Sequence, residues 1–202
     1  MLFILGSIIM KKTSEENNEI KYEYKKQMGV MKGKSLRPLW LLISGLGGQW
    51  PAMAKALMPI KIFADKVEEC HQILAEFGVD LKNLLLSEDK TTISTMTAKF
   101  CSTTAIEIAL FEVMKAIDIT PDGIIGHSFG EIACAYADGC LSTRDAMIVT
   151  YFRGAVTEND KKIPKGLMAV VGLSRSETRK LCPKGVFIAC NTAKDSVVVS
   201  GN

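Results

Sequence analysis

The chain has 202 residues, of which 48% are hydrophobic and 23% are charged, and its formal net charge is +3. That length and apolar content are enough for a substantial buried core in one or two domains. The basic excess falls within residues 1–37, so the rest is almost neutral and offers no basic face of the kind that binds nucleic acid.

The opening segment, residues 1–36, carries no clear hydrophobic periodicity. Its apolar start, residues 1–10, is too short to span a bilayer and lacks the basic region that begins a signal peptide. Residues 11–34 are polar and charged, which is typical of a flexible linker or leader. We therefore expect a flexible leader over 1–36, no membrane association, and a folded part that begins near residue 37.

The folded part opens with an apolar run and a glycine-rich turn. Residues 39–44 read Leu-Trp-Leu-Leu-Ile-Ser, which predicts a strand buried on both faces of a parallel sheet. Residues 45–49, Gly-Leu-Gly-Gly-Gln, predict a turn that brings backbone N–H groups to a site. Between residues 52 and 77 apolar side chains recur at helical spacing, with a break near Pro59.

Residues 102–117 form the strongest predicted helix, with one apolar face. Pro121 ends it and leads into a short apolar strand, residues 122–125. The pentapeptide Gly-His-Ser-Phe-Gly at 126–130 follows directly, and a helix-like stretch begins at Glu131. This order is typical of a nucleophile elbow, in which Ser128 sits on a tight strand-to-helix turn between two glycines. The alternative is an ordinary βα turn with a solvated serine.

Beyond the elbow the pattern changes. Ser142 to Asp145 predicts a helix cap, and from residue 167 the order strand, helix, strand, strand is typical of a small α+β subdomain, with Ser174 and Glu177 capping its helix. The chain stops directly after a predicted strand, which we interpret as truncation.

The sequence offers a candidate nucleophilic serine but few residues that could act as its base. The chain has only two histidines, His71 and His127, and none follows Ser128, so the triad of a lipase or esterase cannot be built and an unrelated serine hydrolase is disfavoured. Neighbouring side chains diverge on an elbow, so His127 is not expected to be the base. No C-x-x-C pair occurs, which predicts free thiols in a reducing cytoplasm and no bound metal; the cysteines are Cys70, Cys101, Cys134, Cys140, Cys182 and Cys190.

Two further features fit acyl transfer. The N–H of Phe129 and an N–H of the turn near Leu46 could form an oxyanion hole. Arg153, at the end of an apolar helix, could point into a pocket and bind a carboxylate through two hydrogen bonds, although a surface arginine is the simpler alternative.

Together these segments resemble a known family. Residues 126–142 and Tyr-Phe-Arg-Gly at 151–154 closely resemble the malonyl/acetyl transferase domain of animal-type fatty acid synthase. Residues 44–50 and 164–173 resemble the same family in the same order, so the resemblance covers roughly residues 38–202. It implies an α/β-hydrolase-like core with a parallel sheet over 37–165 and part of a ferredoxin-like α+β subdomain over 166–202.

The resemblance also implies a reaction. Malonyl and acetyl groups pass from coenzyme A to a serine as an ester, and then to the phosphopantetheine thiol of an acyl carrier domain. No cofactor is bound permanently, and the other partners are the neighbouring domains of the synthase, such as the ketosynthase. The choice among malonyl, acetyl and methylmalonyl groups stays open.

Individual positions match the family's motifs. Ser128 matches its nucleophile, and Leu46 and Phe129 match the backbone donors of its oxyanion hole. Substrate-binding positions are matched by the residues Arg153, Gln49, His127 and Asn191. Proline, alanine and methionine at 51–53 depart from the family pattern, which has a glycine before the methionine. The family's catalytic histidine belongs to a segment that would begin after Asn202, so a catalytically impaired or binding-only fragment is the alternative to an active transferase.

Overall fold

The computed structural model describes residues 8–16, 19–26, 38–159 and 166–201. The chain divides into two units, Met1–Glu158 and Asn159–Asn202, and each is described by itself. Within 1–36, where we expected a flexible leader, two strands pair antiparallel, β1 (Ile8–Glu16) and β2 (Glu19–Lys26). In the sequence of β2, polar residues alternate with Ile20, Tyr22 and Tyr24, which is the period-two pattern of a strand.

The first unit contains a two-stranded parallel sheet of β3 (Trp40–Ile43) and β4 (Gly123–Gly126). Leu41 and Ile43 are buried, whereas Trp40 and Leu42 are 59% and 58% exposed. The prediction of a strand buried on both faces was therefore wrong in the described residues, because alternate side chains of β3, Trp40 and Leu42, stay exposed.

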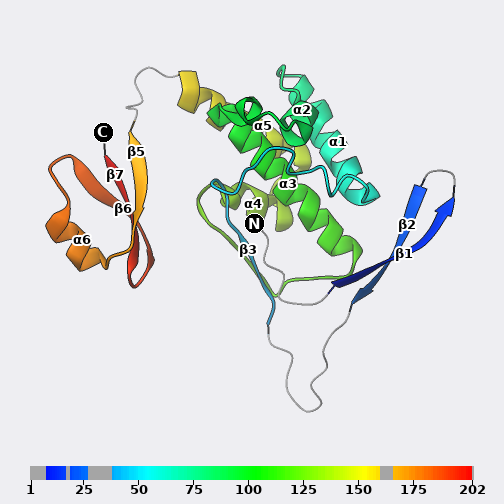
Figure 1. Ribbon diagram of the computed structural model, residues 1–202, viewed down its shortest axis with the longest axis horizontal. Coiled ribbons are helices and arrows are strands. Elements are labelled where there is room, and N and C mark those ends of the chain that lie inside the picture. Colours follow the sequence, from blue (N-terminus) through cyan, green and yellow to red (C-terminus); the bar gives the residue numbers. More distant parts are fainter. Residues whose placement is uncertain (1–7, 17–18, 27–37, 160–165, 202) are drawn as a thin grey trace, which may run out of the picture. The chain divides into compact units, whose positions relative to one another are not determined.

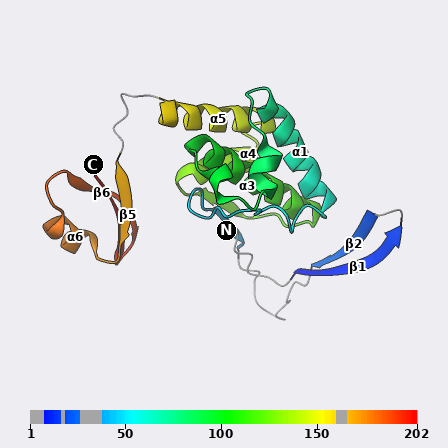
Figure 2. The same cartoon turned by 45° about the horizontal axis from the view of Figure 1, so that its top comes forward.

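In the described part of this unit, five α-helices accompany the sheet: α1 (Lys61–Ala75), α2 (Leu81–Leu86), α3 (Met96–Ala116), α4 (Glu131–Ala137) and α5 (Thr143–Asn159). Figures 1 and 2 show α3 at the centre of the group, next to α1 and α4. It begins six residues before the predicted start because the Thr95 hydroxyl accepts a hydrogen bond from the Ala98 N–H at 3.0 Å. A 3-10 helix, Lys90–Ile93, precedes it.

Close packing fixes α5 on α3. A Cβ added at Gly154 would lie 2.6 Å from the Cα of Thr97, and the Thr97 hydroxyl donates to Glu158 at 2.7 Å. The predicted cap of α5 is present, since the Asp145 N–H donates to the Ser142 hydroxyl at 3.1 Å. These contacts hold the C-terminal half of α5, and with it Arg153, at a defined place beside α3.

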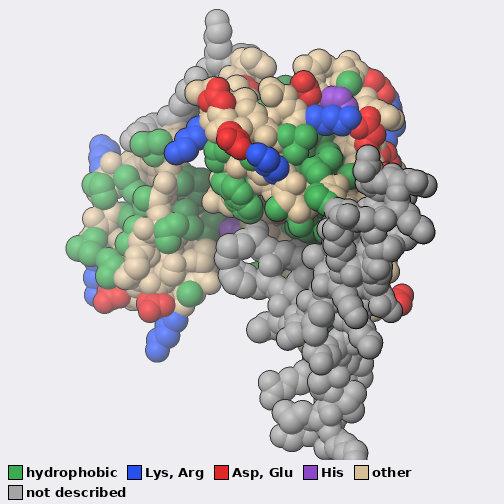
Figure 3. All heavy atoms as spheres, turned by 45° about the vertical axis from the view of Figure 1, so that its right-hand side comes forward, with side chains coloured by type: hydrophobic (Ala, Val, Ile, Leu, Met, Phe, Trp, Pro, Cys, Tyr) green, Lys and Arg blue, Asp and Glu red, His purple; other side chains and the backbone are tan. Residues whose placement is uncertain are grey.

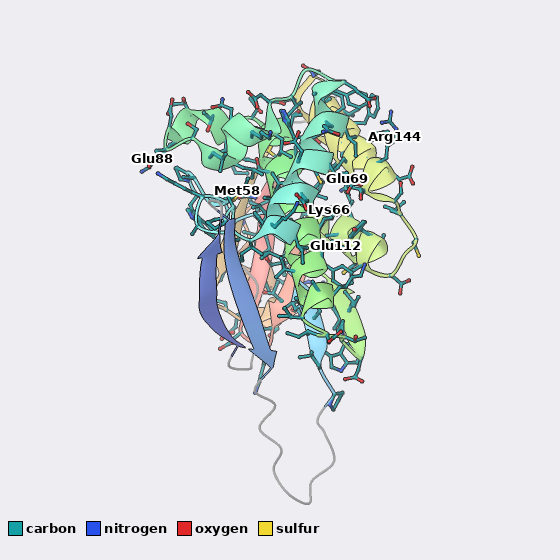
Figure 4. The ribbon with its side chains drawn as sticks, turned by 90° about the vertical axis from the view of Figure 1, so that its right-hand side faces the viewer. Met58, Lys66, Glu69, Glu88, Glu112 and Arg144 are labelled. Atoms are coloured by element: carbon teal, nitrogen blue, oxygen red, sulfur yellow. The ribbon has the colours of Figure 1, made fainter. Side chains whose placement is uncertain are left out.

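Polar contacts also join the helices at their outer surface. Lys66 of α1 pairs with Glu69 at 2.5 Å and lies 5.6 Å from the centre of the Tyr136 ring of α4. The Tyr136 hydroxyl donates to Glu112 of α3 at 2.8 Å. Figure 4 shows Lys66, Glu69 and Glu112 on neighbouring helices, so one polar cluster links α1, α3 and α4.

The second unit has the predicted order of strand, helix, strand, strand: β5 (Leu167–Val171), α6 (Arg175–Leu181), β6 (Val186–Ala193) and β7 (Ser196–Gly201). The antiparallel sheet has the order β5-β7-β6. Ser174 and Glu177 form the predicted capping box of α6. Hydrophobic side chains lie exposed on this unit (Figure 3), among them Leu167, Met168, Val170 and Phe187.

Candidate active site

The central feature of the site is the backbone of Ser128. Strand β4 ends at Gly126, a 3-10 helix spans Ser128–Gly130, and α4 begins at the next residue. Ser128 has a φ of +55°, in the left-handed region, which costs an L-amino acid about 1–2 kcal/mol. Its side chain is exposed. An exposed serine in a strained strand-to-helix turn has the geometry of a nucleophile elbow.

The two glycines of the pentapeptide are required by close contacts. A Cβ at Gly126 would lie 2.6 Å from the Cα of Glu131, and a Cβ at Gly130 would lie 2.4 Å from the carbonyl oxygen of Ile43. Both neighbours are backbone atoms, which cannot move aside as a flexible side chain can. The spacing of glycines two residues either side of Ser128 therefore reflects the approach of β4, α4 and β3 to one another.

The glycine-rich turn after β3 lies directly against the elbow. Gly45 and Gly47 have φ values of +74° and +112°. A Cβ at Gly45 would lie 2.8 Å from the Gly130 nitrogen and 3.1 Å from the Phe129 nitrogen. The structure thus brings the segment that carries Leu46 next to the segment that carries Phe129, although these two predicted donors are 83 positions apart in the sequence.

Gln49 is used within this turn. Its Oε1 accepts a hydrogen bond from the Gly47 N–H at 3.1 Å, and its Nε2 donates to the Thr103 hydroxyl of α3 at 2.6 Å. The Thr103 hydroxyl in turn donates to the Lys99 carbonyl at 2.8 Å. The side chain of Gln49 therefore connects the turn to α3, and its part in substrate binding stays a prediction.

Arg153 and His127 each contact a residue of this arrangement. The guanidinium carbon of Arg153 lies 4.9 Å from the centre of the Phe129 ring, within the range of a cation–π contact. That ring stacks on Phe100 of α3 at 3.8 Å between centres. The Nδ1 atom of His127 lies 3.4 Å from the carbonyl oxygen of Ser44. Among the described residues, no histidine is hydrogen-bonded to Ser128.

Asn191 lies on β6, in the second unit. It lines a cavity of about 560 Å³ together with residues of α6 and its cap: Ser174, Arg175, Ser176, Arg179, Lys180 and also Lys194. Its relation to Ser128 stays a prediction.

The sequence analysis missed Glu107 of α3. Its Oε1 accepts a hydrogen bond from the Gly45 N–H at 3.0 Å, and its Oε2 is buried without a partner among the described residues. Burial raises the pKa of Glu107 to about 7, against the opposing effect of the Gly45 bond. The available signal was a charged residue inside the apolar run Ala-Ile-Glu-Ile-Ala-Leu at 105–110.

A cavity of about 480 Å³ adjoins the turn. Its lining is mostly apolar and comes from β3, the turn, the segment that follows the turn and α3, including Leu42, Gln49, Trp50, Met53, Ile106 and Glu107. Within the described residues no group of three His, Cys, Asp or Glu side chains could hold a metal ion. Nor does any helix in the described ranges combine the length and apolar character needed to cross a membrane.

Comparison with known proteins agrees with this geometry. A highly reducing polyketide synthase, sphB, from Aspergillus fumigatus is 32% identical over 171 residues, which is 80% of this chain and 7% of that relative. The acyltransferase domain from the second module of the salinomycin polyketide synthase is 30% identical, with a TM-score of 0.72 over 83% of this chain and 40% of that chain.

The malonyl CoA-acyl carrier protein transacylase (fabD) from Coxiella burnetii has a TM-score of 0.73 at 22% identity, over 82% of this chain and 54% of that chain, and supports the fold alone. The chain therefore spans only a small part of the curated synthase that it matches and about half of these solved domains. The profile of the acyl transferase domain family matches residues 40–202, and the chain belongs to that family.

Proposed function

We propose that this chain is part of an acyltransferase domain that moves a malonyl or acetyl group from coenzyme A to an acyl carrier domain. The observation that carries the proposal is the strained, exposed Ser128 between β4 and α4, with the glycine-rich turn against it. Ser128 Oγ attacks the thioester carbonyl, the C–S bond breaks, and coenzyme A leaves as the thiol. The phosphopantetheine thiol of the carrier then attacks the serine ester and regenerates the hydroxyl.

The predicted oxyanion donors fit this reaction. The tetrahedral intermediate carries a negative oxygen, which the N–H groups of Leu46 and Phe129 would stabilise. Each such donor is typically worth about a hundredfold in rate. The contact between Gly45 and the nitrogens of Phe129 and Gly130 supports the proposal, since it keeps the two donor segments adjacent.

Arg153 is proposed to select a carboxylated acyl group. Its guanidinium lies beside Phe129, one residue from the nucleophile, and can pair with the free carboxylate of a malonyl group. An acetyl group has no such carboxylate. We therefore propose that malonyl is preferred over acetyl, and that Gln49, His127 and Asn191 contribute to substrate binding.

A separate question is whether the domain belongs to a polyketide synthase or to a fatty acid synthase. The two reported relatives that are at least 30% identical, sphB and the salinomycin synthase domain, belong to polyketide synthases, which supports a polyketide context. The fatty acid synthase context that the motifs at 126–142 imply stays a prediction. Transfer of the acyl group from the loaded chain to isolated carrier domains of each synthase class would discriminate between them.

The test is formation of an acyl adduct on the purified chain, followed by intact-mass measurement after incubation with malonyl-CoA or acetyl-CoA. The proposal predicts a malonyl adduct that Ser128→Ala abolishes and that Ser94→Ala, a matched change at another exposed serine, leaves intact. Arg153→Ala should lower malonyl loading more than acetyl loading. A folded parent without any adduct would favour the alternative of a binding-only chain, which the lack of a histidine bonded to Ser128 in the described residues supports.

A further inference from the structure

The glycine-rich turn is anchored by a carboxyl group from the central helix. The bond from the Gly45 N–H to Glu107 Oε1 at 3.0 Å joins residues that are 62 positions apart. The other oxygen of this carboxyl is buried and lacks a partner among the described residues. Burying a carboxyl group in this way costs free energy, because the group loses its hydrogen bonds to water and gains only one in return, from the Gly45 N–H.

Gly45 is the residue through which this anchor reaches the elbow. It directly precedes Leu46, and its Cα faces the backbone of His127 and Gly130 closely enough that a Cβ would lie 2.8 Å from each. Glycines at 45, 47 and 48 give the turn a wide range of backbone conformations. A turn of this composition needs outside contacts to keep one conformation, and Glu107 provides one of them.

We propose that Glu107 is a positioning residue that holds the Gly45 amide and thereby orients the Leu46 N–H toward the acyl group on Ser128. The effect of this role on catalysis rests on the proposed function, acyl transfer through Ser128. The hydrogen bond itself does not depend on that function. Gln49 and Thr103 fix the far end of the same turn, so the two contacts with α3 hold it at both ends.

The surroundings of Glu107 make its ionisation observable. Residues 40–50, which form β3 and the turn, contain no titratable side chain. From α4, Cys134 interacts with Glu107, and burial raises the pKa of that thiol to about 11. Burial raises the pKa of Glu107 to about 7, so this carboxyl changes charge near neutral pH. The His127 imidazole also faces the turn, with its Nδ1 3.4 Å from the Ser44 carbonyl oxygen, and Glu107→Gln separates the effect of Glu107 from that of His127. Its ionised form is the stronger acceptor for the Gly45 N–H.

The first arm of the test is an NMR titration of the ¹⁵N-labelled parent chain, in which the Gly45 amide resonance is followed with pH. The proposal predicts a large shift that titrates in the parent and in Glu112→Gln, and that is lost in Glu107→Gln. Glu112 is a matched control because it is also a carboxyl of α3, but its contacts are with Lys115 and Tyr136. A Gly45 resonance that does not titrate in the parent, or that titrates equally in Glu107→Gln, would overturn the anchor.

The second arm measures the rate of acyl-adduct formation with malonyl-CoA. Glu107→Leu, which removes the acceptor at similar volume, should be slower by up to about a hundredfold, the typical worth of one oxyanion donor. Glu107→Gln keeps an acceptor oxygen and should stay within a few fold of the parent, as should Glu112→Leu. Parental rates in folded Glu107→Leu would contradict the proposal. An unacylated parent would contradict the proposed function instead, while the NMR arm still decides whether Glu107 anchors the turn.

Discussion

The elbow at 126–130 and the turn at 45–49 are both rich in glycine, but the glycines serve different purposes. At Gly126 and Gly130 a Cβ would collide with backbone atoms of neighbouring elements. At Gly47 a Cβ would meet nothing within 4 Å, and the glycine is needed for its φ of +112°. The elbow is therefore fixed by backbone packing, whereas the turn packs against the elbow backbone at Gly45 and is otherwise held by side chains of α3.

This difference explains why the two halves of the proposed oxyanion hole respond differently to sequence change. The Phe129 N–H belongs to a segment that cannot move without separating β3, β4 and α4. The Leu46 N–H belongs to a segment whose position depends on Glu107, Thr103 and Gln49. Substitutions in the elbow should act mainly on folding, and those around the turn mainly on acyl transfer.

The largest effect is expected for Gly130→Ala. The new Cβ would lie 2.4 Å from the Ile43 carbonyl oxygen, so β3 and the elbow must separate. We expect a loss of about 3 kcal/mol in the free energy of unfolding, the upper part of the range for overpacking, together with loss of the acyl adduct. Urea unfolding measures the change in the free energy of unfolding. Gly172→Ala, where a Cβ meets nothing within 4 Å, should be nearly neutral; equal effects of the two changes would contradict the packing argument.

Next in size is the pH dependence of stability that Glu107 imposes. Its pKa is raised from 4.5 to about 7 in the folded chain, so the folded state keeps a proton that the unfolded state has lost. Stability should therefore fall as pH rises from about 4.5 to about 7, by roughly 3 kcal/mol in total. Glu107→Gln should remove this slope. Urea midpoints at about pH 5 and about pH 8 measure it, and the same slope in both proteins would show that Glu107 does not cause it.

A smaller stability effect is expected for Gly47→Ala, which forces an alanine into a strained φ without any clash. We expect a cost of about 1–2 kcal/mol, with a larger proportional loss in the rate of Ser128 acylation because the Leu46 N–H is displaced. Gly139→Ala is the matched control, since Gly139 also has a positive φ, +80°, and open space around it. Its acylation rate should equal that of the parent. Equal loss of acylation in both variants would contradict a special role for the turn.

The smallest effect is expected for Thr103→Val, which removes the hydroxyl that accepts from Gln49 at similar volume. The loss of this hydrogen bond should cost about 1 kcal/mol. Hydrogen exchange of the Gly47 amide should become faster, because Gln49 no longer holds the turn. Unchanged exchange at Gly47 would show that the contact with Thr103 is not needed.

The elbow could be predicted from the sequence because its requirements are local. Two glycines, a serine, a preceding apolar strand and a following helix all fall within residues 122–137. The anchor at Glu107 could not, because it depends on a contact between a helix and a turn 62 positions away. The exposure of Trp40 and Leu42 was missed for a related reason, since an apolar run does not reveal which of its faces meets a helix.

The central claim is that Ser128 is the acyl acceptor, and peptide mapping after reaction with malonyl-CoA tests it most directly. Trypsin releases residues 116–144 as one peptide, which contains Ser128, Ser142 and the exposed thiol of Cys140. We predict a malonyl group on Ser128, as an ester that resists neutral hydroxylamine. A hydroxylamine-sensitive adduct on Cys140, or an adduct outside this peptide, would contradict the assignment of the nucleophile.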